Sequence, residues 1–328
     1  TKLLAVERGW WVEFDLDHPG IDHHGGAFTP ALTLARAYAS LDSAHHESPE
    51  VLASLEEGLR YLHTMVYPGC KRVGNWWSWD IGMPMKLLPM LYLVEGALDA
   101  EVYGAYVDTA IYLLRCEKDV QAEGAYAPPA EPFVGKTDTN ALWVAHRRLQ
   151  LAVLIENPAM AGKWSDQSFG EAGTPGEGYL QADYSYKFHG AIPMWAYGRA
   201  FLSDYGSMVR TYQSTYLGPT PVQLERYAAM AEHFVQGFLY RSRICPAMIG
   251  RTLTRSEEHH HIAYGPPGVI ALATLAKTAP RWAEQFAPVV PRERGYYEDV
   301  RRYPTAWAVA LHDVPEAEPA PPVHDVFS

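Results

Sequence analysis

The chain has little cysteine, little positive charge and no long hydrophobic run. Its 328 residues include three cysteines, too few for a disulfide scaffold. Lysine and arginine number 27 against 38 aspartates and glutamates, and the net charge of −11 argues against a protein that binds nucleic acid by neutralising phosphates. No stretch of eighteen apolar residues is present, so the sequence predicts no membrane span.

The sequence also lacks the short motifs of several enzyme classes. A glycine-rich phosphate loop and a serine nucleophile elbow are both missing, which leaves nucleotide chemistry and acyl transfer without support. Three histidine clusters lack the spacing of a helical zinc motif: His23-His24, His45-His46 and His259-His260-His261. We therefore expect neither a metal nor a cofactor.

Aromatic residues and helical patterns are abundant instead. The chain contains 10 Trp and 21 Tyr and is 48% hydrophobic, a composition typical of a globular protein. Apolar residues follow helical spacing in most segments, and proline opens several of them, as it does at the first position of helices. We predict helices over residues 31–40, 49–66, 84–98, 102–115, 140–155, 193–205, 221–239 and 267–278.

This pattern predicts an all-α fold in which helical hairpins pack in succession into an incomplete (α/α) toroid. Two long segments, 121–139 and 161–189, are predicted to be loops, and loops of this length in a compact domain are usually functional or mobile. The proline-rich residues 314–328 are predicted to form an extended linker or tail.

A tryptophan-rich segment is the most unusual part of the sequence. Trp76, Trp77 and Trp79 follow Asn75 within five residues, and each indole N–H needs a partner if the ring is buried. One interpretation is an aromatic platform on a loop that stacks on sugar faces. The other is an aromatic plug between helices, and the sequence alone leaves both open.

Another segment brings an imidazole and a phenol toward one region. Pro193 is expected to start a helix, which leaves His189 just before the helix and Tyr197 one turn inside it. Such a pair can move protons. A hydrogen-bonded structural pair is the alternative.

Two guanidiniums lie four residues apart in a third segment. Arg251 and Arg255 can face the same side, an arrangement that suits recognition of a carboxylate in an otherwise acidic protein. The alternative is a solvated pair that bridges Glu257 or Glu258.

Taken together, these segments resemble the catalytic α-domain of polysaccharide lyase family 8, which includes hyaluronate, chondroitin AC and xanthan lyases. The resemblance spans roughly residues 30–310 and follows the family's order of motifs. The motifs are Asn75-Trp76-Trp77 with Ile81-Gly82 and Pro84, Thr137-Asp138-Thr139-Asn140, the 189–198 segment and the 251–255 segment. The interval of 8 residues between His189 and Tyr197 is one shorter than in hyaluronate lyases.

The resemblance implies a role for each motif residue. Tyr197 is expected to be the proton-abstracting base with His189 as its partner, and Asn140 to bind the substrate carboxylate. Arg251 and Arg255 are expected to stabilise the developing charge. The expected substrate-binding residues are Asn75, Trp76, Trp77 and Lys187.

The implied reaction is β-elimination on a uronic acid, in which a base removes the C5 proton and the glycosidic oxygen leaves C4. The expected partner is an anionic polysaccharide, hyaluronan or chondroitin before xanthan, with no nucleic acid and no membrane. The resemblance assigns the catalytic domain to residues 1–313 and implies a following β-sandwich region that this chain does not contain. It also implies a secreted, cell-surface or periplasmic protein, and because the chain starts at Thr1 we expect any targeting segment to lie outside it.

Two other functions stay open on the sequence. A glycoside hydrolase needs two carboxylates that flank the scissile bond, and Asp80 and Asp183 are the candidates. A non-catalytic sugar-binding domain needs only the tryptophan platform. Elimination leaves an unsaturated, ultraviolet-absorbing end, whereas hydrolysis does not, so product analysis separates the two enzymes.

Overall fold

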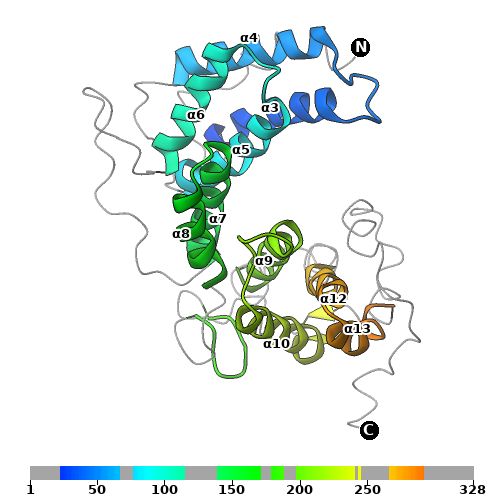
Figure 1. The fold of residues 1–328 in the computed structure, drawn as a ribbon. Helices are drawn as coiled ribbons and strands as arrows, with labels where there is room; N and C mark the ends of the chain where they lie inside the picture. The colour runs from blue at the N-terminus through cyan, green and yellow to red at the C-terminus, as the bar shows by residue number, and fades with distance from the viewer. Residues whose placement is uncertain are drawn as a thin grey trace. The chain divides into compact units, whose positions relative to one another are not determined.

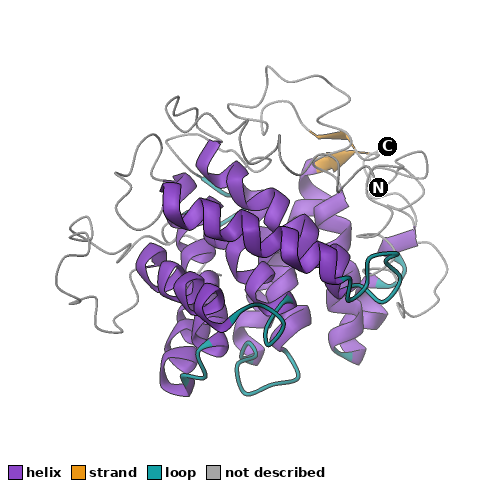
Figure 2. Ribbon diagram, turned by 90° about the horizontal axis from the view of Figure 1, so that it is seen from above, coloured by secondary structure: helices purple, strands orange, loops and turns teal. Residues whose placement is uncertain are grey.

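The computed structural model describes residues 23–66, 77–114, 139–170, 179–187, 197–240, 243–244 and 266–291, and most of these residues are helical (Figures 1 and 2). The helices are α3 (His23–Ala39), α4 (Pro49–Val66), the π-helix η1 (Ser78–Gly82), α5 (Pro84–Leu93), α6 (Ala100–Leu114), α7 (Thr139–Leu154), α8 (Pro158–Gly170), α9 (Arg199–Tyr212), α10 (Pro221–Phe238), α12 (Pro266–Thr278) and α13 (Pro280–Phe286). Strands β1 (Leu239–Tyr240) and β2 (Arg243–Ile244) pair in antiparallel orientation. None of the helices described is long and apolar enough to cross a membrane.

The chain divides into two compact units. Unit 1 comprises residues 1–134 and 144–161, and unit 2 comprises residues 135–143 and 162–328. Helix α7 is shared, since its first five residues belong to unit 2 and the rest belong to unit 1.

Unit 1 has an aliphatic core built from amphipathic helices. On α4, Val51, Leu55, Leu59 and Leu62 recur at helical spacing, and each is at most 1% exposed. Helix α3 packs against α4 and α5, and α5 packs against α6. The predicted helix over residues 49–66 is confirmed, because the buried stripe on α4 is also the apolar pattern visible in the sequence.

Unit 2 has a core rich in aromatic rings. Tyr186 lies 5.9 Å from Phe201, Phe201 lies 5.7 Å from Tyr205, and Tyr205 lies 4.7 Å from Tyr227, measured between ring centroids. We call these four residues the aromatic row. Two tyrosine hydroxyls in the row donate to backbone carbonyls, that of Tyr205 to Phe169 at 3.1 Å and that of Tyr227 to Leu202 at 2.9 Å. Each tyrosine ring of the row therefore fills apolar space while its hydroxyl keeps a partner.

Helix α8 occupies part of the predicted 161–189 loop, so that prediction is wrong over residues 161–170. Asn157 caps the helix, since its Oδ1 accepts the N–H of Met160 at 3.0 Å. The buried face of α8 includes two serines, Ser165 and Ser168, beside Phe169. Because serine does not register as apolar, the hydrophobic periodicity of this helix is not visible in the sequence.

Other helix boundaries differ from the predictions in smaller ways. Helix α5 ends at Leu93 rather than at residue 98, and a turn with Gly96 at a φ of 74° follows it. Helix α3 begins earlier than predicted, at His23, and α13 was not predicted. The start of the predicted 193–205 helix lies outside the described residues, as do the tail 314–328 and most of the 121–139 segment.

Candidate functional site

Three segments of unit 2 meet at Thr139, the first residue of α7. The Thr139 N–H donates to Tyr186 Oη at 2.6 Å, and Thr139 Oγ1 lies 2.9 Å from both Tyr186 Oη and the carbonyl oxygen of Tyr197. Since the Thr139 hydroxyl carries one proton, it donates to the Tyr197 carbonyl, and the Tyr186 hydroxyl donates to Thr139 Oγ1. We call these bonds the Thr139 junction. The junction ties the start of α7 to the 179–187 turn and to the residues that lead into α9.

A second contact between α7 and the start of α9 lies one turn further along α7. The ring of Trp143 lies 6.4 Å from the ring of Tyr197, measured between centroids. The Trp143 indole N–H donates to Asp204 Oδ2 on α9 at 2.5 Å. The first turn of α7 is therefore held against Tyr197 at both of its ends, and Asn140 belongs to this turn.

The side chain of Asn140 is buried with an unsatisfied amide oxygen. Asn140 is 5% exposed, and no described residue donates a hydrogen bond to its Oδ1. An acceptor of this kind costs about 1–3 kcal/mol if it stays unpaired, so a ligand or a water molecule that donates to it stabilises the site. Asn140 Oδ1 is thus an acceptor open to a hydroxyl or another donor, in the turn that contacts Tyr197.

The 179–187 turn leads toward His189. An isolated bridge between Leu180 and Tyr186 closes this turn, and the N–H of Lys187 donates to the Tyr179 carbonyl at 2.7 Å. The side chain of Lys187 is exposed. The turn therefore places one ammonium group in solvent two residues before the predicted imidazole.

The same turn weakens the hydrolase interpretation. Hydrogen bonds from Ser185 are the main cause that lowers the pKa of Asp183. A glycosidase general acid needs a raised pKa, because it must carry a proton at working pH. Asp183 is therefore unsuited to that role, and Asp80, the other candidate, is buried in η1 of unit 1.

The described part of the tryptophan-rich segment lies in unit 1. Trp79 is 2% exposed and belongs to the hydrophobic core, as the aromatic-plug interpretation predicts for that ring. Trp77 is half-buried and packs on Gly82, where an added Cβ would lie 2.9 Å from Trp77 Cζ3. Glycine at this position therefore allows the ring to approach the π-helix backbone. Trp77 keeps exposed surface that Trp79 lacks.

The predicted site residues divide into three groups. Asn140, Tyr197 and Lys187 belong to unit 2, and the Thr139 junction links the first two. Trp77 belongs to unit 1. The others lie outside the described residues: Asn75, Trp76, His189, Arg251 and Arg255.

Tyr186, Trp143 and Asp204 are residues that the sequence analysis did not single out, although they build the contacts around Asn140. Trp143 follows Asn140 by three residues, the spacing of neighbours on one helix face, and this was the available signal. Nothing comparable marks Tyr186 or Asp204, because their partners lie 47 and 61 residues away.

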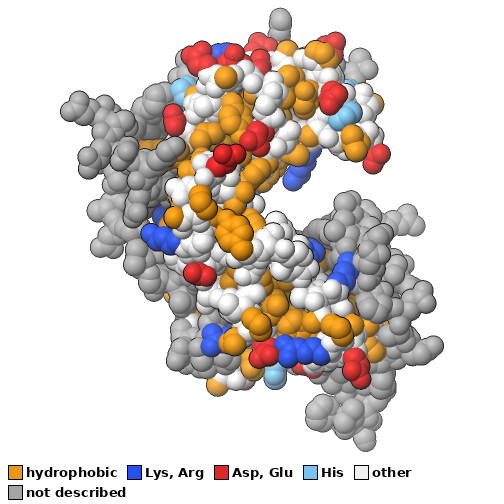
Figure 3. Space-filling view, viewed as in Figure 1, with side chains coloured by type: hydrophobic (Ala, Val, Ile, Leu, Met, Phe, Trp, Pro, Cys, Tyr) orange, Lys and Arg blue, Asp and Glu red, His pale blue; other side chains and the backbone are white. Residues whose placement is uncertain are grey.

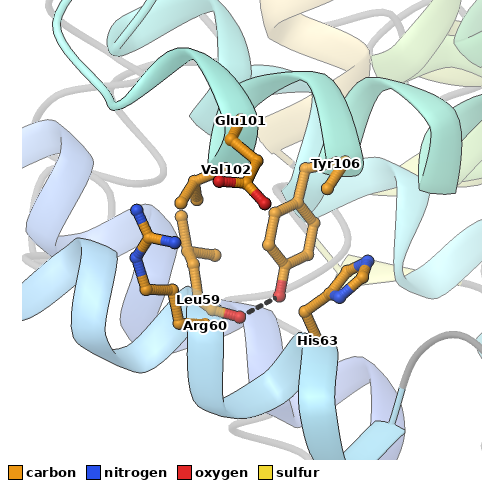
Figure 4. Close-up of a pocket in the computed structure, with 7 residues that line it drawn as sticks. Leu59, Arg60, His63, Glu101, Val102 and Tyr106 are labelled. Atoms are coloured by element: carbon orange, nitrogen blue, oxygen red, sulfur yellow. Dashed lines mark hydrogen bonds between the residues drawn. The ribbon is translucent and has the colours of Figure 1, made fainter.

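A pocket between α4 and α6 of unit 1 contains none of the predicted site residues (Figure 4). The Tyr106 hydroxyl donates to the Leu59 carbonyl at 2.6 Å, and burial raises the pKa of Tyr106. The Arg60 guanidinium pairs with Asp99 at 3.1 Å. Elsewhere too, the described residues contain no group of three or more His, Cys, Asp or Glu side chains that could hold a metal ion.

The chain matches a family model described as the N-terminal alpha-helical domain of polysaccharide lyase family 8 over residues 11–290. It is 24% identical to the hyaluronate lyase HylB of Enterococcus faecalis, over 77% of this chain and 26% of that protein. It is 23% identical to the xanthan lyase of a Bacillus species, over 97% of this chain and 35% of that protein. The chain thus spans only about a quarter to a third of the length of these relatives.

Two solved structures share the fold. The chondroitin AC lyase of Streptomyces coelicolor A3, solved with chondroitin sulphate, matches 98% of this chain and 46% of that chain with a TM-score of 0.76 and 20% identity. A Paenibacillus xanthan lyase matches 95% of this chain and 30% of that chain with a TM-score of 0.75 and 17% identity. The predicted fold class, an all-α incomplete (α/α) toroid, is confirmed. The sequence match and the shared fold agree: the chain belongs to polysaccharide lyase family 8, in the part formed by the N-terminal helical domain.

Proposed function

We propose that this chain is the catalytic domain of a carbon–oxygen lyase that cleaves a uronic-acid-containing polysaccharide by β-elimination. One observation carries the proposal: the buried side chain of Asn140 lies in the helical turn that is held against Tyr197 at both ends, so the turn that carries the amide contacts the residue that carries the phenol. Family membership supports the reaction class, because its named members cleave hyaluronan, xanthan or chondroitin.

Asn140 addresses the main difficulty of the reaction. The C5 proton of a uronate is weakly acidic, because its removal places a second negative charge beside an ionised carboxylate. An amide N–H from Asn140 to that carboxylate stabilises the enolate as it forms, and the predicted Arg251 and Arg255 would add positive charge. Loss of one such preorganised donor typically costs about 3–4 kcal/mol of transition-state stabilisation.

Tyr197 is the proposed base. Its phenolate takes the C5 proton, the electron pair forms the C4–C5 double bond, and the C4–O bond breaks. The phenol then returns the proton to the departing glycosidic oxygen if both groups lie on one face of the sugar, so one residue serves as base and acid. The predicted partner His189 either shares the base role or holds the phenol by a hydrogen bond.

The proposed substrate is hyaluronan or chondroitin, with xanthan next. The protein has a net charge of −11, so a polyanion must bind it through a local basic site. Acidic side chains gather over α4 (Figure 3), which carries Glu50, Glu56 and Glu57, so α4 is unsuited to this binding. Lys187, exposed two residues before His189, is one such group. Asn75, Trp76 and Trp77 are proposed to contact the sugar rings, and such apolar contact is not screened by salt.

The test of the proposal is to incubate the purified chain with hyaluronan, chondroitin and xanthan and to follow the absorbance of the new double bond. We expect unsaturated product from at least one polymer. Asn140→Ala should lower kcat by about 10²- to 10³-fold, and Tyr197→Phe should lower it by at least about 10²-fold. Tyr216→Phe, at a tyrosine that is 78% exposed, is the matched control and should keep full activity.

Other results would favour other functions. New reducing ends formed without the double bond, with saturated uronates at the non-reducing ends, would identify a hydrolase. Polysaccharide binding without any product would identify a binding module. Full activity of Tyr197→Phe would remove that residue from the mechanism.

Location follows from the proposed substrate. Polysaccharides of this kind lie outside the cell, so we propose that the protein is secreted, attached to the cell surface or periplasmic. Fractionation of the producing cells with an antibody against the chain tests this, and finding the protein only in the cytosol would contradict it.

A further inference from the structure

We propose that Tyr186 is a positioning residue whose hydroxyl, acting through Thr139, fixes the placement of Asn140 relative to Tyr197. The inference rests on the proposed function, because it concerns the geometry of that reaction. Tyr186 does not have to touch the substrate for this role. It acts on two segments that each carry one of the proposed catalytic groups.

The Thr139 junction is a buried set of hydrogen bonds. Thr139 is 0% exposed and Tyr186 is 3% exposed, so water does not compete for these bonds. The Thr139 N–H is one of the first N–H groups of α7, which have no partner within the helix, and Tyr186 Oη accepts it at 2.6 Å. The Tyr186 hydroxyl donates to Thr139 Oγ1, and the Thr139 hydroxyl donates to the Tyr197 carbonyl, so both hydroxyl protons of the junction are used.

The role of the hydroxyl is separable from the role of the ring. The Tyr186 ring packs near Phe201 and stacks on Tyr179 at 6.3 Å, and a phenylalanine ring would keep both contacts. The loss of the hydroxyl would leave the Thr139 N–H without its acceptor and Thr139 Oγ1 without a donor. Tyr186→Phe therefore removes the hydrogen bonds of the junction while it keeps both ring contacts.

The reaction explains why this placement matters. The base must reach C5–H while the amide holds the carboxylate on the same carbon, so the two groups need a fixed separation. A displacement of about 1 Å in such an arrangement can lower the rate by about 100-fold. Because ground-state binding depends on many sugar contacts, the effect should fall on kcat rather than on KM.

The test compares Tyr186→Phe with Tyr227→Phe. Tyr227 is a matched control, since it is buried in the same aromatic row and its hydroxyl, like that of Tyr186, donates a buried hydrogen bond, here to the Leu202 carbonyl. Tyr186→Phe should lower kcat about ten- to a hundredfold with KM within about threefold. Tyr227→Phe should lose similar stability in urea but keep kcat within about twofold. Equal losses of kcat in the two variants would overturn the positioning role.

Thr139 variants test the same junction from its other side. Thr139→Val removes the hydroxyl at nearly constant shape and should reproduce the kcat loss of Tyr186→Phe. Thr139→Ser keeps the hydroxyl and should restore most of the activity. Failure of serine to restore it would show that the methyl group, not the hydrogen bond, matters.

Hydrogen–deuterium exchange separates this inference from the proposed function. Peptides that cover residues 139–143 and 197–201 should exchange faster in Tyr186→Phe than in the wild-type protein, and they should be unchanged in Tyr227→Phe. If exchange does not change, the junction does not hold the two segments together. If the wild-type protein cleaves none of the three polymers, the proposed function fails, while the exchange result still decides whether Tyr186 holds the two segments.

Discussion

His146 is a buried histidine at the centre of α7, where it is 5% exposed beside Arg147. Burial, with a smaller contribution from the Arg147 charge, lowers the pKa of His146 well below its usual 6.5. The folded protein therefore keeps this imidazole neutral, whereas the unfolded chain takes up a proton as the pH falls below about 6.5. Because the unfolded state then binds more protons, the free energy of unfolding decreases as the pH falls through this range.

We predict that His146→Gln reduces this acid sensitivity. A single histidine can contribute a slope of up to about 1.4 kcal/mol per pH unit below its unfolded pKa, and none well above it. Urea denaturation at pH 5, 6, 7 and 8 measures the slope, with His45→Gln, at a half-exposed position, as the control. A variant whose slope equals that of the wild-type protein would show that His146 does not set the acid response.

Helices differ in how well the sequence predicts them. Helix α4 matches its predicted range because its buried positions are Val51, Leu55, Leu59 and Leu62, and hydrophobic periodicity detects such residues. Helix α8 has serines on its buried face, and one of them, Ser165, donates to the Leu217 carbonyl at 2.6 Å. That bond depends on a partner 52 residues away, which no local pattern can indicate.

The same distinction applies to the candidate site. Asn140 and Tyr197 were identified from motifs, which are local in sequence, and so were the residues that lie outside the described ranges. The Thr139 junction and the bond from Trp143 to Asp204 were not predicted. They depend on how the first turn of α7 meets Tyr197 and Asp204, and such contacts are set by side chains from segments far apart in the sequence.

At the element scale, we predict that Asn157→Ala weakens α8. The substitution removes the acceptor of the Met160 N–H and should lower the free energy of unfolding by about 1 kcal/mol. Asn157→Asp keeps an oxygen at the same place and should be close to the wild-type protein. Urea denaturation measures both variants, and equal stability of the alanine and wild-type proteins would contradict the capping role.

At the scale of the whole molecule, the two units have cores of different composition. The unit 1 core is mainly aliphatic, with residues such as Leu87 and Leu88 at 0% exposure. Unit 2 depends on the aromatic row, in which Tyr205 and Tyr227 also satisfy their hydroxyls. Each core lies within its own unit, so damage to one should affect that unit first.

We predict that Leu88→Ala loosens unit 1 before unit 2. The cavity should cost about 2–5 kcal/mol, and the helices α3 to α6 should then exchange their amide hydrogens faster. The helices α9, α10 and α12 should change much less. Hydrogen–deuterium exchange measures both regions in one experiment, and an equal increase in both would show that the cores unfold as one cooperative body.

Unit 2 is discontinuous along the chain, since residues 135–143 precede the insertion of residues 144–161 that belong to unit 1. A recombinant fragment that starts at residue 162 would keep Tyr186 and Tyr197 but lose Thr139 and Asn140. Dissection of this protein at that unit boundary, which falls within α8, would therefore discard the amide while retaining the phenol. Any minimal version must carry the nine residues before that insertion, either in place or grafted by circular permutation.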